Sequence, residues 1–135
     1  MAIYLSNGVV VTLNSVALSD HVTMATINRV FDELEVTAMG DSAHKFVKGL
    51  EESTIQLDFL SDTAASNVND TLQAAWGTTV PLTLKQTDAA VSATNPLYST
   101  TVLVNNTQDI NGGPADIATQ SITFTCNSVI VITTS

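Results

Sequence analysis

Positive charge is the scarcest property of this 135-residue chain, which has four Lys and Arg residues against thirteen Asp and Glu residues. The formal net charge is −9, and an acidic surface repels phosphate groups, so tight binding to nucleic acid is not expected. Repulsion would suit a wall that must not adhere to DNA, although solubility alone explains an acidic surface. Charged residues of both signs make up only 13% of the chain, about half of the usual ~25%. Ser, Thr, Asn and Gln must supply the remaining polar surface, which suits broad packing contacts.

Reactive side chains are equally few. Cys126 is the only cysteine, which excludes an internal disulfide, and its apolar neighbours at a spacing of two predict a buried, unreactive thiol. The two histidines, His21 and His44, lie far apart in the sequence, and one Cys with two His is a poor set of zinc ligands. No nucleophile elbow, zinc-protease motif or phosphate-binding loop is present. We therefore expect no enzyme, no catalytic residues, no metal and no cofactor.

Long apolar runs and aromatic side chains are also missing. No stretch of about 18 apolar residues is present to span a membrane, and no basic N-terminal region precedes an apolar one. We therefore expect neither a membrane span nor a signal peptide, and a protein made and used in a cytoplasm. Aromatic residues make up only 5% of the chain, too few for a platform that binds sugars or bases. With 44% hydrophobic residues, residues 1–135 are expected to form one domain with its own core.

Hydrophobic and polar residues alternate along most of the chain, which is the pattern of β-strands with one buried face. In residues 53–60, Ile55, Leu57 and Phe59 share one face. The run Val-Ile-Val-Ile-Thr near the end is apolar on both faces, which predicts a strand covered on both sides or buried at a subunit contact. The same period of two, with many Val and Thr residues, predicts further strands over 8–13, 21–28, 33–39, 80–87, 98–104 and 122–126.

One segment has helical spacing instead, because its apolar residues recur every four positions at Val68, Leu72 and Trp76. Gly77 stands where a helix should stop, and the sequence predicts one short amphipathic helix over about 63–76. The residues that could cap its start are Asp62 and Ser66.

The order of these elements predicts a mainly β protein. We expect two packed antiparallel sheets or a flattened barrel, with the single helix covering a sheet or closing one end of a barrel. Turn-forming residues predict loops over 88–96 and 105–116.

Two groups of polar residues suggest a site, and each has a simpler explanation. Asp109 and Asn111 are spaced like part of a calcium-binding loop, but no bidentate acidic residue follows at the right distance, which favours a plain turn. Glu33 and Glu35 form a pair of neighbouring carboxylates, but they lie on the polar face of a strand. Catalytic carboxylates need an enclosed site, so we expect this pair to face water.

Basic side chains gather in the segment 40–50, which we predict to be a loop between two strands. Lys45 and Lys48 flank Phe46 in this segment. A positive loop with an apolar tip on an acidic body is complementary to its own surface, which favours head-to-tail association into rings or filaments. Alternatively, the loop is an ordinary exposed one with Phe46 folded back onto the core.

The stretch VTAMGDSAHKFVKGLEESTIQLDFLSD, followed by a helix that ends in LQAAWG, resembles the major tail tube proteins of long-tailed (siphovirus-like) bacteriophages. In that family, a strand ending in Val-Thr-x-x-Gly-Asp leads to a Phe-x-x-Gly-Leu turn, an alternating strand and a short helix. The likeness is local to 36–77, and the order of β elements around one helix extends it loosely to most of the chain. The matching positions are Val36, Thr37, Gly40, Asp41, Phe46, Gly49, Leu50 and Leu72.

The resemblance implies a structural virion protein. In tail tubes, six subunits form a ring whose inner sheets join into a continuous β-barrel, and stacked rings form the channel for genome ejection. The long loop between strands contacts a neighbouring subunit or ring, which assigns that role here to Asp41, His44, Lys45, Phe46 and Lys48. The lumen of such tubes is usually acidic, and the polar sides of the strands that bracket the loop supply candidates for it. These lumen candidates are Glu33, Glu35, Gln56 and Asp58.

The resemblance also implies the partners. They are further copies of this chain in homohexameric rings, together with tape-measure, tail terminator and baseplate proteins, and genomic DNA only in passage. It implies a location in the virion tail after assembly in the host bacterial cytoplasm. One alternative is another β-rich virion protein, such as a capsid decoration or head–tail joining protein. A second alternative is a small-molecule-binding barrel or an enzyme domain, which needs a pocket with convergent polar groups that the sequence does not indicate.

Overall fold

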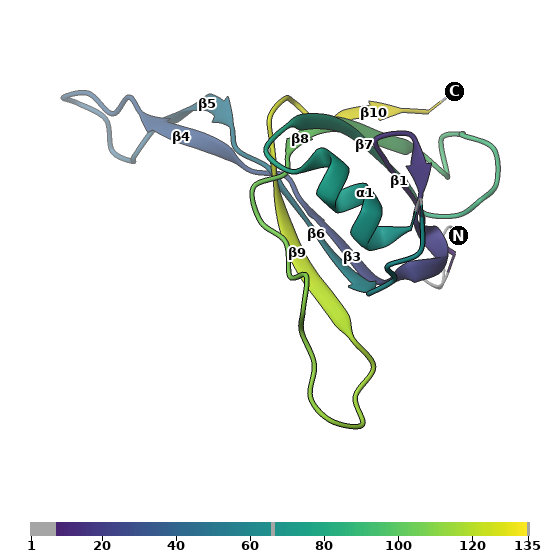
Figure 1. Ribbon diagram of the computed structural model, residues 1–135. Coiled ribbons are helices and arrows are strands. Elements are labelled where there is room, and N and C mark those ends of the chain that lie inside the picture. The colour runs from purple at the N-terminus through teal and green to yellow at the C-terminus, as the bar shows by residue number, and fades with distance from the viewer. Residues whose placement is uncertain (1–7, 66, 135) are drawn as a thin grey trace.

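The computed structural model describes residues 8–65 and 67–134, and its main element is one curled antiparallel sheet of eight strands (Figure 1). The strand order is β2–β1–β7–β8–β9–β6–β3, and β10 pairs with the start of β8. A second antiparallel sheet contains β4 and β5. The strands are β1 (Val10–Leu13), β2 (Val16–Ala17), β3 (Val22–Asn28), β4 (Phe31–Glu35), β5 (Phe46–Glu51), β6 (Thr54–Leu60), β7 (Thr79–Lys85), β8 (Leu97–Leu103), β9 (Thr119–Cys126) and β10 (Val131–Thr133).

The hydrophobic core lies inside the curl of the large sheet, where helix α1 (Val68–Ala75) covers its concave side (Figure 1). Strict alternation along β6, β7 and β9 sends every second side chain into this core. A short 3₁₀ helix, η1 (Ser19–His21), leads into β3. The core residues with no exposed area include Leu13, Leu57, Phe59, Leu82, Val102, Ile122 and Phe124.

The predicted fold class is confirmed, since the described residues are mainly β, with antiparallel sheets and one α-helix. The barrel alternative is not supported, because β2 and β3 end the large sheet without pairing with each other in the described residues. In the same residues, the structure contains no helix with the length and apolarity needed to cross a bilayer.

Helix α1 is shorter than the predicted 63–76. Its start is delayed because the Asp62 carboxylate accepts a hydrogen bond from the backbone N–H of Ala64 at 2.9 Å, which holds 62–64 in a turn. The predicted end is confirmed, because Gly77 has a φ of +74° and its N–H donates to the carbonyl of Val104 at 2.8 Å. Ser66, the other predicted cap, lies outside the described residues. Trp76 does not join the buried stripe as predicted, since it is 51% exposed and Ala75 fills that place.

The predicted loop over 40–50 is wrong in its second half. Phe46 begins strand β5. This strand was not predicted from the sequence, because the apolar residues from Phe46 to Glu51 do not alternate and both faces of the strand are exposed. The two strands are joined by residues 36–45. The strand near the C-terminus is present as β10, but Val131 and Ile132 are exposed rather than covered on both sides within the chain.

Candidate assembly surface

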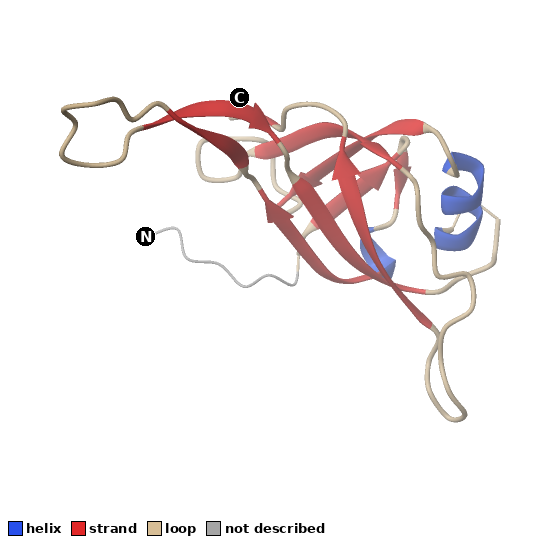
Figure 2. Ribbon diagram, turned by 90° about the vertical axis from the view of Figure 1, so that its left-hand side faces the viewer, coloured by secondary structure: helices blue, strands red, loops and turns tan. Residues whose placement is uncertain are grey.

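Strands β4 and β5, with the connecting residues 36–45, form a two-stranded ribbon that projects from the body on the side opposite helix α1 (Figure 2). The ribbon continues the pairing of β3 with β6. Asn28 pairs with Thr54, and Phe31 pairs with Glu51. The second pair lies three residues after Asn28 and three before Thr54, so the register is the same. Between these pairs, the N–H of Glu52 donates to the carbonyl of Val30 at 2.6 Å. The ribbon is therefore the outer half of one long hairpin, and the large sheet fixes its direction.

A β-bulge interrupts the ribbon near its base. Phe31 pairs with Glu51, but Glu33 pairs with Lys48, so Gly49 and Leu50 lie opposite Asp32 alone. The strands are so close here that a Cβ on Gly49 would lie 2.9 Å from both the Cβ and the carbonyl oxygen of Asp32. Glycine is therefore required at position 49 for this approach, which explains one residue of the turn motif noted in the sequence.

The basic side chains of the ribbon already have partners within it. Lys45 Nζ lies 2.8 Å from the Asp41 carboxylate, and His44 Nδ1 contacts the Glu35 carboxylate. Lys48 Nζ lies 5.6 Å from the ring centre of Phe31. The hydrogen bond from Lys45, followed by one from the Ala38 N–H, lowers the pKa of Asp41. The ribbon is thus not a free positive loop. Residues 31–52 contain six acidic residues and two lysines, so their formal charge is −4.

One face of the ribbon is apolar and exposed. Alternation places Val30, Leu34 and Val36 on one side of the first strand, and Val47 is paired with Leu34 on the second. The exposed fractions are 53% for Val30, 52% for Leu34, 49% for Val36 and 47% for Val47. We call these four residues the apolar face. Exposed apolar side chains gathered on one surface mark contact sites more often than isolated ones do.

The long hairpin belongs partly to the large sheet and partly to the ribbon. The apolar face lies on the side of the hairpin that carries polar residues within the large sheet. In β3 and β6, the pairs Ile27–Ile55 and Ala25–Leu57 face the core. Because side chains alternate, Val30 and Leu34 follow Thr26 on the opposite, outward side. Beyond the junction between the sheets, the hairpin therefore carries apolar side chains on its outward side as well, and the core of the same chain cannot cover the apolar face.

The base of the ribbon is fastened to the C-terminal segment. The Glu51 carboxylate accepts a hydrogen bond from the Ile130 N–H at 2.9 Å, and this bond is the largest cause of a lowered Glu51 pKa. Ile130 itself is buried, while Val129 and Val131 on either side are exposed. The contact brings further exposed apolar residues close to the base of the ribbon.

The outward face of the large sheet is polar and almost free of charge. Gln56 and Asp58 lie on this face opposite Thr123 and Ser121 of β9. The Ser121 hydroxyl donates to the Asp58 carboxylate at 2.7 Å, and the Gln56 amide donates to the Ser121 hydroxyl at 3.2 Å. Hydroxyl and amide groups that bond to one another give a flat, hydrated surface rather than a pocket.

The structure brings only some of the predicted residues together. Asp41, His44, Lys45, Phe46 and Lys48 all lie on the ribbon, and Phe46 is 54% exposed rather than folded onto the core. The four lumen candidates do not share one surface. Gln56 and Asp58 lie on the outward sheet face, whereas Glu33 and Glu35 lie on the ribbon side that continues the core face. A single surface of all four carboxylate and amide groups is therefore not formed within one chain.

Sequence reasoning missed the apolar face. Leu34 and Val36 alternate with glutamates and therefore resemble any half-buried strand, so nothing in the local pattern marks them as exposed. A signal is present over a longer range. The apolar residues stand at odd positions in 53–60 and at even positions in 33–39, and one continuous hairpin cannot bury both sets against one core.

Other kinds of site receive little support from the geometry. The Cys126 thiol is half-buried, and burial raises its pKa, as expected for an unreactive thiol. Among the described residues, no three His, Cys, Asp or Glu side chains are grouped to hold a metal ion. Asp109 and Asn111 lie in an open cavity of about 380 Å³ in the loop before β9.

Comparison with known proteins places the fold in a class. A chain in the virion of a native gene transfer agent particle superposes with a TM-score of 0.78, at 9% identity, over 97% of this chain and 99% of that chain. The SPP1 tail tube superposes with a TM-score of 0.77, also at 9% identity, over 98% of this chain and 80% of that chain. The fold is therefore that of a phage tail tube protein. No protein-family model matches the sequence, and no curated protein has significant sequence similarity to it.

Proposed function

We propose that this chain is a non-enzymatic structural protein that assembles with copies of itself into the tail tube of a phage-like particle. The observation that carries the proposal is a tail-tube fold from which a ribbon extends an apolar face that its own core does not cover. Such a face favours a permanent contact with another molecule. The ribbon residues Asp41, His44, Lys45, Phe46 and Lys48 belong to this inter-subunit or inter-ring contact.

In the finer form of the proposal, six subunits close into a ring, rings stack into a tube, and the genome passes through it at ejection. The outward sheet face with Gln56 and Asp58 lines the channel. The hydroxyl and amide groups of this face bond to one another and to water, and the face offers no cation to which the phosphates of DNA could bind. Tape-measure, tail terminator and baseplate proteins bind the tube. Assembly takes place in the bacterial host, and the final location is the virion tail.

The test is negative-stain electron microscopy of the purified protein, dilute and concentrated. Rings or stacked tubes with a central hole are the expected result. A closed oligomer without a channel would contradict the proposal. A chain that stays monomeric at every concentration, and also in the presence of tape-measure and tail terminator proteins, would favour a capsid decoration protein instead.

The lumen assignment has its own test. Neutralising Asp58 with Asp58→Asn should slow ejection or lower infectivity without changing tube formation. A normal ejection rate in tubes built from this variant would remove the sheet face from the channel.

A further inference from the structure

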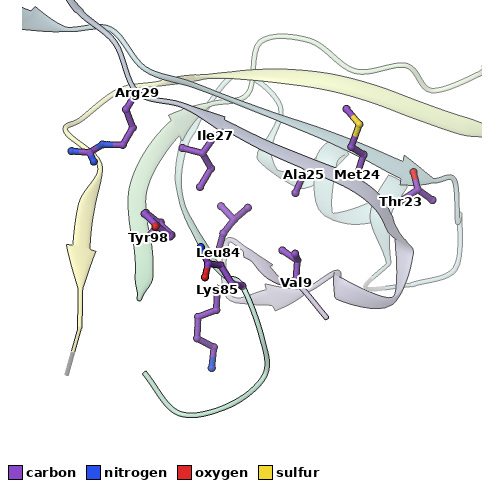
Figure 3. Close-up of a pocket in the computed structure, with 10 residues that line it drawn as sticks. Val9, Thr23, Met24, Ala25, Ile27, Arg29, Leu84, Lys85 and Tyr98 are labelled. Carbon is purple, nitrogen blue, oxygen red and sulfur yellow. The ribbon is translucent and has the colours of Figure 1, made fainter. Parts of the chain in front are cut away.

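A groove of about 510 Å³ lies beside β3, on the open side of the large sheet (Figure 3). Because the sheet does not close, Ala25 and Ile27 of β3 face Leu84 of β7 and Tyr98 of β8 across a gap that no further strand fills. The walls of the groove therefore combine apolar side chains with nearly as much polar surface. Its lining residues include Val9, Ala25, Ile27, Leu84, Lys85 and Tyr98.

Two basic residues stand at this groove, Arg29 at the end of β3 and Lys85 at the end of β7. The chain has four basic residues, and the other two belong to the ribbon, so the groove holds all the positive charge of the remaining sequence. Lys85 Nζ donates to the carbonyl of Ala89 at 3.0 Å, and neither Arg29 nor Lys85 forms an ion pair within the part of the chain that the structure describes. In a chain of net charge −9, a groove that combines apolar side chains with two such cations suits a partner that is both apolar and acidic.

The ribbon has these properties. Its apolar face carries two carboxylates, Asp32 between Val30 and Leu34 and Glu52 opposite Val30. Neither carboxylate forms an ion pair among the described residues. The ribbon cannot turn back into the groove of its own chain, because its strands continue the register of β3 and β6. A second copy of the chain offers the same ribbon to this groove.

We propose that the apolar face of the ribbon of one copy lies in the groove beside β3 of a neighbouring copy, with Asp32 and Glu52 close to Arg29 and Lys85. The contact is head-to-tail, since the surface used on one copy differs from the surface used on the next, so it generates rings or open stacks. This inference rests on the proposed function in taking the neighbour to be another copy of this chain, and it adds the surface that receives the ribbon.

Charge reversal on each side tests the pairing. The groove variant Arg29→Glu with Lys85→Glu, and the ribbon variant Asp32→Lys with Glu52→Lys, should each need a more than about tenfold higher concentration to assemble, because like charges then face each other. An equal mixture of the two variants should assemble near the wild-type concentration, because every ribbon then finds a groove of opposite charge. The chain that carries all four substitutions should also recover.

The measurement is sedimentation velocity over a concentration series, with thermal unfolding of each variant to establish that it folds. Asp109→Lys with Asp116→Lys is the matched control, since it changes the net charge as the ribbon variant does but lies in the loop before β9, and it should assemble like wild type. Deleting residues 1–7 tests whether the chain's own start fills the groove.

The outcomes separate this inference from the proposed function. If all variants form tubes like wild type, or if the mixture stays as unassembled as its components, the pairing is refuted while the tube remains. Rescue of the groove variant by deletion of residues 1–7 also refutes the pairing. If wild type forms no assembly at any concentration and the two variants do not associate, both proposals fail.

Discussion

Removing the apolar face should weaken assembly without weakening the folded chain. The perturbation is Leu34→Asn with Val36→Thr and Val47→Thr, where each valine is replaced by a side chain of the same shape. About half of each residue is already exposed, and surface substitutions usually change the free energy of unfolding by no more than about 0.5 kcal/mol each, so the three together should lower it by less than about 1.5 kcal/mol. The stability of the monomer and the strength of the contact are thus separated.

The size of the effect follows from the exposed area. Complete burial of a Val or Leu side chain contributes about 1.5–3 kcal/mol, so covering the exposed half of each contributes about 1 kcal/mol. Three such side chains contribute about 3 kcal/mol to one contact, which corresponds to a loss of about 100-fold in association constant.

The assay is the concentration at which sedimenting assemblies first form, measured beside thermal unfolding. The control is Ile110→Thr with Ile117→Thr in the loop before β9, where two exposed apolar side chains are lost away from the ribbon. Assembly of the triple variant at the wild-type concentration would refute the reasoning. So would a loss of monomer stability of several kcal/mol, since the three side chains would then support the chain itself.

Three further predictions concern stability. Gly49→Ala should destabilise the ribbon by about 1–3 kcal/mol, because the new Cβ meets Asp32, and should speed the hydrogen exchange of the ribbon's backbone amides. The control is Gly77→Ala, where no atom lies within 4 Å, and it should cost only the backbone strain of a positive φ. Asn95→Ala should cost about 2–3 kcal/mol in urea unfolding, because its amide bonds to the carbonyls of Thr87, Ala89 and Ala90, and exposed Thr94→Ala should cost little. His21 lies between two carboxylates, mainly that of Asp62, which raise its pKa above 6.5, so its stabilisation is complete below pH 6.5 and disappears as pH rises through the raised pKa. The free energy of unfolding of His21→Gln should lack this decline, and an equal decline in both proteins would assign it elsewhere.

The sequence was sufficient to predict most strands of the large sheet and insufficient for the ribbon. Strands such as β6 and β9 were predicted because one face of each is buried against one core, so the period of two appears directly in the residues. The end of α1 was predicted because glycine at a positive φ has a local cause. These features depend on short-range chemistry or on a single core.

The ribbon depends on pairing over a longer range. Phe46 to Glu51 forms a strand because it continues the register of β6 with β3, and neither face is buried in the chain. The basic residues of this segment looked like a free positive patch, but Lys45 pairs with Asp41 four residues before it. Glu35, nine residues before His44, reaches the histidine only because the chain folds back on itself. The helix start was misplaced because Asp62 forms a turn that competes with the helix.

The continuous pairing of the long hairpin across the junction between the sheets also has a mechanical consequence. A pull on the ribbon along its axis passes directly into β6, which is paired over its whole length, from Thr54 to Leu60, with β9. Such a force loads all of these hydrogen bonds at once in shear, instead of opening them one at a time as a zipper. If neighbouring copies hold the ribbon, tension along an assembly is therefore resisted by the central strands of each subunit, and bending is concentrated at the bulge beside Gly49.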